Sequence, residues 1–360
     1  MTKYVCEIVD DLKRDDSFIT NDKIEKVTKL RHTFNMNNKN LGLRMLAKRL
    51  ITEDIEVHAY SYYLKNNIDP NMLIFQDIPN KNFESIISKW KNTVKYLIIN
   101  ESEIIKSKSW DVSLHNNFDK IFTWHLDYIK HEKFIHLPSI NTRFDLNNIF
   151  HNISFKNRPK FSSIVASNKF SNHPLELYSE RLKTINWFSE NHYKNLDLYG
   201  FGWNKLKIYR KNIFARLFNR LGFPSKFFVK YTNIYKGMID NKINTLTQYK
   251  FDFVYENAIG IPGYVTEKIF DSFLAGTIPV YLGPEISTLT IPKNCFIDRR
   301  NFKNHDDLYY YLVNMSEEEY KEKQENISIF LHSDPGKMFS VESYVDILCN
   351  QIIKDLNTND

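Results

Sequence analysis

Residues 248–298 constrain the fold more strongly than any other part of the chain. Apolar and polar side chains alternate over Lys250–Tyr255, which predicts a half-buried strand. After a turn rich in glycine and proline, Thr266 is a suitable N-cap for a helix with an apolar face, and Gly276 is suited to end that helix. Thr277–Leu282 is a continuous apolar run, typical of a strand buried on both faces. The stretch therefore predicts a β-α-β unit, which places ligands at the carboxyl ends of its strands.

The chemistry of this unit lies in the first turn of its helix, where Glu267 and Lys268 are adjacent. Free backbone N–H groups and the helix dipole favour an anion there, and the lysine adds a full positive charge. A carboxylate at the same place can accept hydrogen bonds from sugar hydroxyls. The pair suits a ligand that carries both hydroxyls and phosphates, such as a sugar nucleotide. The alternative is an ordinary charged first turn, with the glutamate on the dipole and the lysine in water.

Three consecutive segments resemble a known family: Tyr255–Asn257, Gly263–Ile269 and Ala275–Gly283 are similar to the signature of the α-1,3/4-fucosyltransferases, glycosyltransferase family 10. The resemblance is clear over residues 159–302 and weak before them. It implies an α/β GT-B fold, with two Rossmann-like domains that face a central cleft. It also implies an inverting sugar transfer, usually from GDP-fucose.

Composition agrees with a two-domain globular protein, since the chain has 360 residues and 15% aromatic side chains. The three cysteines, Cys6, Cys295 and Cys349, are too scattered for a disulfide framework or a metal cluster, which favours reduced thiols. No apolar run reaches about 18 residues, and the acidic N-terminal segment is unlike a signal peptide. The animal members of the resembled family are anchored in the Golgi membrane. We therefore expect a bacterial-type cytoplasmic protein.

Residues 1–152 are expected to form the first Rossmann-like domain, which would bind the acceptor. We interpret roughly the first 30 residues as a polar, weakly helical preamble. Beyond them, short segments rich in Ile, Val, Tyr and Phe alternate with helical segments such as Phe83–Lys91, which predicts an open parallel sheet. The expected strands are Ile55–Tyr60, Met72–Ile78, Lys95–Asn100 and Lys120–Trp124.

Two carboxylates, Glu101 and Glu103, follow the expected strand Lys95–Asn100 and would face the ligand crevice. An inverting transfer needs a general base that takes the proton of the acceptor hydroxyl. The resemblance implies a glutamate after this strand, often followed by Ser-Pro. Glu101-Ser102 matches that pattern and Glu103 replaces the proline, so Glu101 is the predicted base and Glu103 the alternate. Both could instead be solvated loop carboxylates.

Residues 153–336 are expected to form the donor domain. Its predicted elements are the strands Phe161–Ala166, Leu196–Tyr199 and Pro292–Asp298 and the helices Leu175–Phe188, Asn241–Thr247 (capped by Asp240), Asp306–Met315 and Glu317–Leu331. The resemblance implies a Ser-Asn pair after the first of these strands, matched by Ser167-Asn168, and a diphosphate-binding arginine at the start of the following helix. That place holds His173-Pro174-Leu175, so Arg181 is a candidate substitute and the donor sugar stays open.

The predicted donor-binding residues combine the motif matches and the helix start: Ser167, Asn168, Arg181, Asn257, Tyr264, Thr266, Glu267 and Lys268. No Asp-x-Asp pair, which commonly holds a nucleotide diphosphate through a divalent ion, occurs anywhere in the 360 residues. We therefore predict that Lys268 and the helix dipole stabilise the leaving diphosphate. On this hypothesis the protein needs no metal and no cofactor besides the nucleotide sugar.

Residues 205–231 carry eight lysines and arginines and no acidic residue, which predicts a basic insertion. An apolar face among these charges is typical of an interfacial helix on anionic lipid. Two alternatives are contact with nucleic acid and a solvated rim. We favour contact with the inner face of the membrane and expect no nucleic-acid partner. The predicted contact residues are Arg210, Lys211, Phe214, Arg216, Leu217, Phe218 and Arg220.

Residues 337–360 include an amphipathic helix, Val341–Leu356, which we expect to brace the first domain. The sequence as a whole favours an inverting fucosyltransferase-like enzyme that acts on a cell-surface or lipid-linked glycan, of the lipopolysaccharide or O-antigen type. One alternative keeps the chemistry with another nucleotide sugar. The other is a non-catalytic protein that binds the membrane surface.

Overall fold

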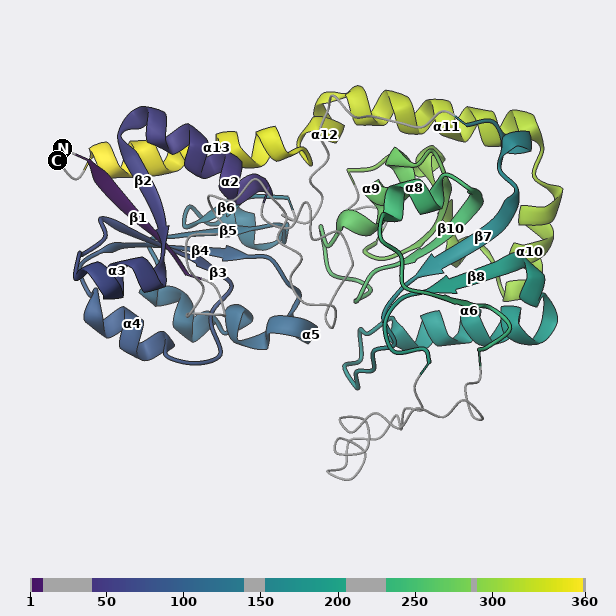
Figure 1. The fold of residues 1–360 in the computed structure, drawn as a ribbon, viewed down its shortest axis with the longest axis horizontal. Coiled ribbons are helices and arrows are strands. Elements are labelled where there is room, and N and C mark those ends of the chain that lie inside the picture. The colour runs from purple at the N-terminus through teal and green to yellow at the C-terminus, as the bar shows by residue number, and fades with distance from the viewer. Residues whose placement is uncertain (1, 9–40, 139–152, 205–230, 286–289, 359–360) are drawn as a thin grey trace.

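The computed structural model describes residues 2–8, 41–138, 153–204, 231–285 and 290–358. These residues form two α/β domains, and each domain is built on a six-stranded sheet in which all neighbouring strands run parallel (Figure 1). Parallel strands need crossover connections, and the βα alternation of the sequence supplies them.

The first sheet has the strand order β2-β1-β3-β4-β5-β6. The expectation of a weakly helical N-terminal preamble is wrong for residues 3–8, which form the inner strand β1. This strand is short and is followed by a long charged segment, so its apolar residues Val5, Cys6 and Ile8 gave little signal. The strands are β1 (Lys3–Ile8), β2 (Ile55–Ala59), β3 (Met72–Gln76), β4 (Val94–Ile99), β5 (Lys120–Thr123) and β6 (Phe134–His136).

Helices cover both faces of this sheet (Figure 1). On one face α2 and α13 pack with the sheet into one apolar cluster, and on the other face α3 and α4 pack into a second cluster. The helices and 3-10 turns are α2 (Leu41–Leu50), η1 (Ile51–Glu53), α3 (Tyr60–Asn66), α4 (Phe83–Lys89), α5 (Glu103–Lys106), η2 (Ser107–Trp110), η3 (Val112–Asn117) and η4 (Tyr128–Lys130).

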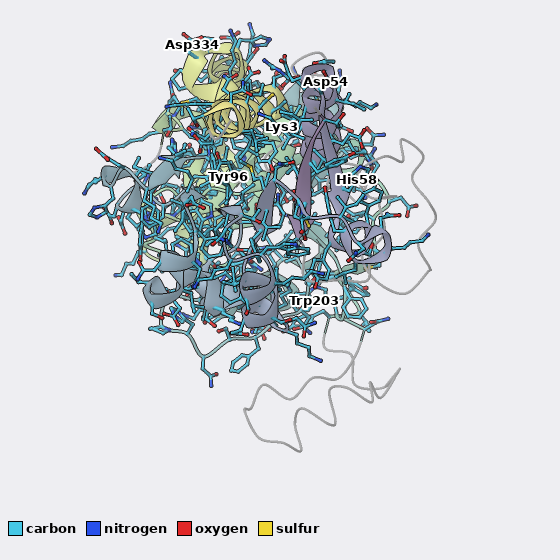
Figure 2. All side chains as sticks on the ribbon, turned by 90° about the vertical axis from the view of Figure 1, so that its left-hand side faces the viewer. Lys3, Asp54, His58, Tyr96, Trp203 and Asp334 are labelled. Atoms are coloured by element: carbon cyan, nitrogen blue, oxygen red, sulfur yellow. The ribbon has the colours of Figure 1, made fainter. Side chains whose placement is uncertain are left out.

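Helix α13 (Val341–Asn357) belongs to the C-terminal end of the chain but lies on the first sheet. Its buried stripe, which includes Leu348 and Ile352, contacts strand and α2 side chains. Lys3, labelled beside the C-terminal helices in Figure 2, donates from Nζ to the carbonyl of Leu356 at 2.7 Å. The Tyr96 hydroxyl of β4 donates to Asp355 Oδ2 at 2.5 Å. The first strand and the last helix of the described residues are thus both tied into the first domain.

The second sheet has the order β12-β11-β10-β7-β8-β9. The expected strand Pro292–Asp298 is wrong for its first part, since only Ile297 and Asp298 pair with β11 and a 3-10 turn precedes them. The strands are β7 (Lys160–Val165), β8 (Leu196–Tyr199), β9 (Tyr235–Gly237), β10 (Tyr249–Tyr255), β11 (Ile278–Leu282) and β12 (Ile297–Asp298).

One large apolar cluster holds the second domain together. The expected helix start at Leu175 is wrong, because Glu176 forms an isolated bridge with Ala258 and the helix begins at Tyr178. The cap expected from Asp240 comes instead from Asn241. The elements are η6 (Phe155–Asn157), α6 (Tyr178–Asn191), η7 (Tyr193–Asn195), α8 (Lys242–Leu246), α9 (Glu267–Leu274), η9 (Lys293–Cys295), η10 (Arg299–Asn301), α10 (His305–Asn314), α11 (Glu317–His332) and α12 (Asp334–Lys337).

Arg158 fixes the end of α9 relative to the sheet. Its side chain is almost fully buried. Its Nη2 donates to the carbonyls of Ala275 and Gly276, both at 2.8 Å, and its Nη1 to the carbonyl of Tyr249 at 2.9 Å. Helix C-termini leave carbonyls without intrahelical partners, and a buried guanidinium with five N–H donors satisfies several at once. This arginine thereby holds α9 and β10, the two elements that carry the site, in fixed register.

Candidate active site

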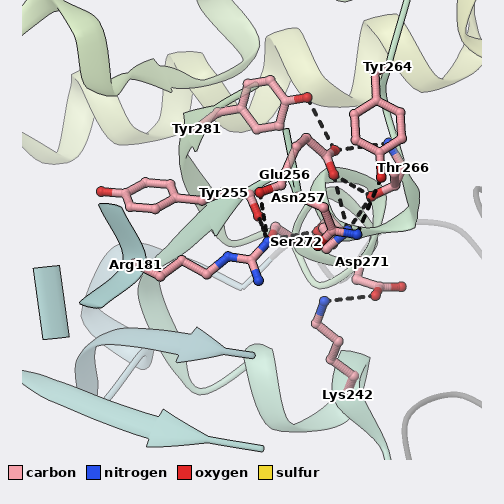
Figure 3. A network of polar contacts seen from close by, with 11 residues as sticks. Arg181, Lys242, Tyr255, Glu256, Asn257, Tyr264, Thr266, Asp271, Ser272 and Tyr281 are labelled. Carbon is pink, nitrogen blue, oxygen red and sulfur yellow. Dashed lines mark hydrogen bonds and ion pairs between the residues drawn. The ribbon is translucent and has the colours of Figure 1, made fainter. Parts of the chain in front are cut away.

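Glu256 is the centre of the polar network at the carboxyl end of β10 and β11 (Figure 3). Its side chain is fully buried, and it accepts bonds from the Thr266 backbone N–H at 2.9 Å and the Thr266 hydroxyl at 2.6 Å. The hydroxyl of Tyr281 on β11 donates to it at 3.2 Å. Thr266 stands at the N-cap position of α9, as expected, but its hydroxyl contacts Glu256 and makes no capping bond to the helix. The carboxylate of Glu256 thus occupies part of the space in front of the helix N-terminus.

Lys268, in the first turn of α9, pairs with this carboxylate. Its Nζ lies 3.1 Å from Glu256 Oε2 and donates to the Thr266 hydroxyl at 2.7 Å, and its side chain is 19% exposed. Burial alone would lower the pKa of Lys268, but the carboxylates of Glu256 and Glu267 outweigh burial and raise it. These two contacts use two of the three ammonium protons. Lys268 is therefore a charged, oriented donor at the surface of the network.

A second ion pair lies beneath the start of α9. Lys242 Nζ is 3.0 Å from Asp271 Oδ2, and both side chains are less than a tenth exposed. Burial alone would lower the pKa of Lys242, but the carboxylates of Asp271, Asp252 and Glu267 outweigh it and raise the pKa. Glu267, the first residue of α9, is half-buried beside this lysine. A buried cation therefore lies close to Glu267, below the helix start.

Arg181 is buried within the second domain, and its bonds go to protein atoms. Its Nη2 donates to the carbonyls of Tyr255 at 2.6 Å and Glu256 at 2.7 Å and to Asn257 Oδ1 at 3.0 Å. Burial lowers the pKa of Arg181. The Asn257 amide in turn donates to the Tyr264 hydroxyl at 3.3 Å. Arg181 therefore closes the carboxyl end of β10 and orients Asn257, a structural contact that the sequence did not indicate.

Ser167 and Asn168 follow β7, as predicted, at the turn where β8 also ends. Asn168 is buried, and its side-chain amide donates to the carbonyl of Gly202 at 3.1 Å. Ser167 is half-buried beside it. Gly200 has a φ of +125°, and a Cβ there would lie 2.0 Å from the carbonyl oxygen of Ala166. Only glycine permits this approach, which brings the ends of β7 and β8 together.

We call Glu256, Asn257, Thr266 and Lys268 the second-sheet edge, and Asp77, Asn100, Glu101 and Ser102, at the ends of β3 and β4, the first-sheet edge. The carbonyl of Glu101 accepts a bond from Trp110 Nε1 at 2.9 Å.

The Glu101 carboxylate acts electrostatically on groups of the second domain. Burial, then Glu101, raises the pKa of Tyr264. The pKa of Tyr178 is raised overall. Burial is the main cause and Glu101 adds to it, whereas Arg181 and Lys268 act in the opposite direction. Lys268 of the second-sheet edge and Glu101 therefore both lie near Tyr178. The structure thus brings the predicted base and the predicted lysine to the same junction.

Glu103, the alternate base, is engaged differently. It is the first residue of the short helix α5, and its Oε1 lies 3.2 Å from Nε2 of His173 in the second domain. The two side chains are 44% and 30% exposed. This contact between a carboxylate and an imidazole lies at the surface and bridges the domains, whereas Glu101 lies beside buried groups.

The two domains are in direct contact next to Glu101. The rings of Trp124 and Tyr264 pack with centroids 4.7 Å apart. Gly263 has a φ of +80°, and a Cβ there would lie 2.3 Å from the carbonyl oxygen of Trp124. The indole N–H of Trp124 also donates to the carbonyl of Asn100 at 3.2 Å. A continuous chain of contacts therefore joins the backbone before Glu101 to the donor-side Tyr264.

Sequence reasoning missed four residues of this site: Asp77, Trp110, Trp124 and Glu256. Glu256 lies inside the quoted segment Tyr255–Asn257, so its burial next to a positively charged helix start could have been suspected. The others carried no local signal, because their contacts join strands far apart in the chain.

Several predicted features lie outside the described residues. The predicted membrane-contact side chains Arg210, Lys211, Phe214, Arg216, Leu217, Phe218 and Arg220 all fall there. Within the described ranges, no helix has the length and apolar character needed to span a membrane. In the same ranges, no three or more His, Cys, Asp or Glu side chains are grouped so that they could hold a metal ion.

Residues 156–325, just under half of the chain, match the family described as glycosyltransferase family 10 (fucosyltransferase) C-term. Alpha-(1,3)-fucosyltransferase FucT of Helicobacter pylori is 43% identical over 75 residues, which are 21% of this chain and 15% of that protein. The 4-galactosyl-N-acetylglucosaminide 3-alpha-L-fucosyltransferase 9 of Mus musculus is 32% identical over 121 residues, 31% of each chain. The matched parts thus span less than a third of either relative.

Solved structures share the whole architecture at low sequence identity. An alpha1,3-fucosyltransferase with GDP has a TM-score of 0.51 at 15% identity, over 100% of this chain and 91% of that one. Sucrose-phosphate synthase from Thermosynechococcus elongatus has a TM-score of 0.56 at 10% identity, over 100% of both chains. These likenesses confirm the predicted GT-B fold. Residues 156–325, which include most of the second domain, are similar in sequence to glycosyltransferase family 10.

Proposed function

We propose that this protein is an inverting glycosyltransferase that moves L-fucose from GDP-fucose to a hydroxyl group of a glycan. The observation that carries the proposal is that a paired, charged lysine at a helix start and a carboxylate from the other domain both act on the same side chain, Tyr178. The match of residues 156–325 to family 10 supports it. So does the likeness in fold to an alpha1,3-fucosyltransferase solved with GDP-fucose, which has a TM-score of 0.51 at 15% identity.

On the donor side, the remaining proton of Lys268 and the N-terminus of α9 would hold the diphosphate. Both are fixed before the reaction, because Glu256 and Thr266 orient the ammonium group. Pre-oriented donors aimed at developing negative charge are worth far more in a water-poor site than in bulk water. Glu267, at the helix start, would accept hydrogen bonds from the sugar or ribose hydroxyls.

On the acceptor side, Glu101 would take the proton from the acceptor hydroxyl. As that oxygen forms its bond to the anomeric carbon, the bond from this carbon to the phosphate oxygen breaks on the opposite face. The electron pair leaves with GDP, and the proton stays on Glu101 until water removes it. A single in-line displacement of this kind inverts the anomeric centre. Glu103 is the alternate base, although its ion pair with His173 makes it the weaker candidate.

We propose that the donor is held without an essential divalent ion, because Lys268 supplies the positive charge that such an ion would provide. Turnover in the presence of EDTA should match turnover with added Mg²⁺ or Mn²⁺. A rate that depends on the added cation would contradict this part of the proposal.

A second candidate keeps the chemistry but takes another nucleotide sugar. It is favoured by the burial of Arg181, the candidate substitute, and by the histidine at position 173 where the family resemblance implies an arginine. A turnover screen of GDP-fucose, GDP-mannose and UDP-sugars separates the two candidates.

The acceptor and location are proposed from the sequence. A cell-surface glycan of the lipopolysaccharide type, built at the inner face of the membrane, fits a cytoplasmic protein with the basic insertion 205–231. Co-sedimentation with anionic liposomes should fall when this segment is deleted.

The deciding experiment is turnover of GDP-fucose with defined oligosaccharide acceptors, followed by NMR of the product anomer. An inverted fucoside supports the proposal, and a retained configuration contradicts the mechanism. If no nucleotide sugar turns over and liposome binding survives Lys268→Met, the non-catalytic membrane-surface alternative is favoured.

A further inference from the structure

Asp77 is a buried carboxyl group to which the proposed reaction gives no role. It directly follows β3, is 5% exposed and has a φ of +59°. This left-handed backbone is uncommon for a residue other than glycine, although aspartate tolerates it better than most. The backbone N–H of Asp77 donates to the carbonyl of Ile98 at 2.9 Å, which fixes the residue against β4. The carboxyl group of Asp77 is thus placed here by a less favourable, left-handed backbone conformation.

The Asp77 carboxyl contacts the residue that precedes the proposed base. Its Oδ1 accepts the backbone N–H of Asn100 at 3.2 Å. The carbonyl of Asn100 accepts from Trp124 and the carbonyl of Glu101 from Trp110. The backbone that presents Glu101 is therefore held by three side chains, of which Asp77 is the ionisable one.

Electrostatics couple the two carboxyl groups. Burial and then Glu101 raise the pKa of Asp77 to about 7, while the Asn100 N–H, Lys106 and the Ser109 hydroxyl lower it. The charged groups that face Asp77 are thus Glu101, at the end of β4, and Lys106, from α5. Below pH 7 Asp77 keeps its proton. Above pH 7 Asp77 ionises, and Glu101 then has a negatively charged neighbour. Coupling between two titrating groups is reciprocal, so ionised Asp77 raises the proton affinity of Glu101.

We propose that Asp77 is a positioning residue for Glu101, which fixes the backbone that carries the base and places a second carboxyl group near it. The inference rests on the proposed function, in which Glu101 accepts the proton of the acceptor hydroxyl. Asp77 itself touches no substrate and exchanges no proton with it.

Two substitutions separate position from charge. Asp77→Asn keeps an oxygen that accepts the Asn100 N–H but removes the titration. We expect its kcat at pH 6 to stay within about threefold of the wild type, and the rise of kcat with an inflection near pH 7 to disappear. Asp77→Ala also removes the acceptor and should lower kcat about 10- to 100-fold, with the donor KM unchanged.

The matched control is Asp119→Asn. Asp119 Oδ2 accepts the backbone N–H of Lys95 at 2.7 Å, the same kind of bond at the opposite end of β4. The Asp119→Asn substitution should leave kcat and the pH profile of kcat as in the wild type. The inference is overturned if Asp77→Asn keeps the inflection, or if folded Asp77→Ala has the wild-type kcat. Should Asp77→Ala fail to fold, the Asp77→Asn profile decides.

A measurement without turnover distinguishes failure of this inference from failure of the proposed function. In ¹³C-carboxyl NMR, the Asp77 signal, assigned by its loss in Asp77→Asn, should titrate near pH 7. In Glu101→Gln its midpoint should move to lower pH, because the neighbouring negative charge is gone. An unmoved midpoint overturns the coupling even in an active enzyme. If the midpoint moves in Glu101→Gln but the wild-type protein transfers no sugar, the coupling is supported and the proposed function is refuted.

Discussion

The two sheet edges meet at one junction but differ in how their buried carboxyl groups are balanced by positive charge. At the second-sheet edge, the Glu256 carboxylate is matched by Lys268 and by N–H and O–H donors. At the first-sheet edge, the carboxyls of Asp77 and Glu101 lie close enough that each opposes ionisation of the other. A compensated network suits the binding of a charged donor with little rearrangement. A pair of competing carboxyl groups suits a proton acceptor, because it keeps proton affinity near the working pH.

The largest expected effect is that of Glu101→Gln. Loss of the general base should lower kcat by about 10²- to 10⁴-fold, while GDP affinity stays unchanged because the second-sheet edge is untouched. Glu103→Gln is the control and should stay within about threefold of the wild type. Equal losses in kcat for both variants would erase the distinction between Glu101 and its exposed neighbour.

Glu256→Gln tests the compensated edge. Removing one partner of a buried pair leaves Lys268 without its counter-charge, and the free energy of unfolding should fall by about 3 kcal/mol. Denaturant unfolding measures this. Glu317→Gln, which breaks an exposed pair with Lys156, should cost about 0.5 kcal/mol or less. If the two losses are similar, Glu256 does not hold the network together.

Trp124→Phe tests the link between the edges. The variant loses the bond from the indole N–H to the carbonyl of Asn100, which should cost about 1 kcal/mol of stability and lower kcat severalfold. Trp90→Phe loses a similar bond to Asp69, away from the junction, so it should lose stability without losing kcat. A normal kcat in Trp124→Phe would mean that the edges act independently.

The smallest effect is expected from His173→Gln, which removes the ion pair with Glu103. Because both side chains are partly exposed, the pair should contribute about 0.5 kcal/mol or less. Thermal unfolding and kcat should both stay close to wild-type values. A large loss of kcat would instead assign the histidine, and with it Glu103, to the reaction.

The β10-α9-β11 unit could be predicted because its signals are local. An alternating run, helical spacing, a terminal glycine and a continuous apolar run lie within one stretch of about 35 residues. The expectation that the first strand is half-buried is wrong, because β10 is an inner strand with nearly all its residues buried. Strand β1 was missed since six residues before a charged segment carry little periodicity, and only pairing with β2 and β3 makes them a strand. Predicted boundaries were wrong where tertiary contacts decide them, as at Glu176, which pairs with Ala258 ahead of α6.

The candidate site was predicted in part for the same reason. Glu101 and Lys268 follow from their positions at a strand end and a helix start. Their partners Asp77 and Glu256 depend on packing between elements. Arg181 shows the limit most clearly, because two of its acceptors are backbone carbonyls, at the end of β10 and directly after it, and every residue carries one. The prediction that Arg181 binds the donor stays a prediction.

The central claim is that the second-sheet edge holds the nucleotide diphosphate through protein charge, separately from the base. Calorimetric titration of GDP in EDTA-containing buffer tests it directly with three proteins: wild type, Lys268→Met and Glu101→Gln. We predict that the wild type and Glu101→Gln bind GDP equally and that Lys268→Met binds at least about tenfold more weakly. Binding that needs an added cation, or that survives in Lys268→Met, would contradict the claim.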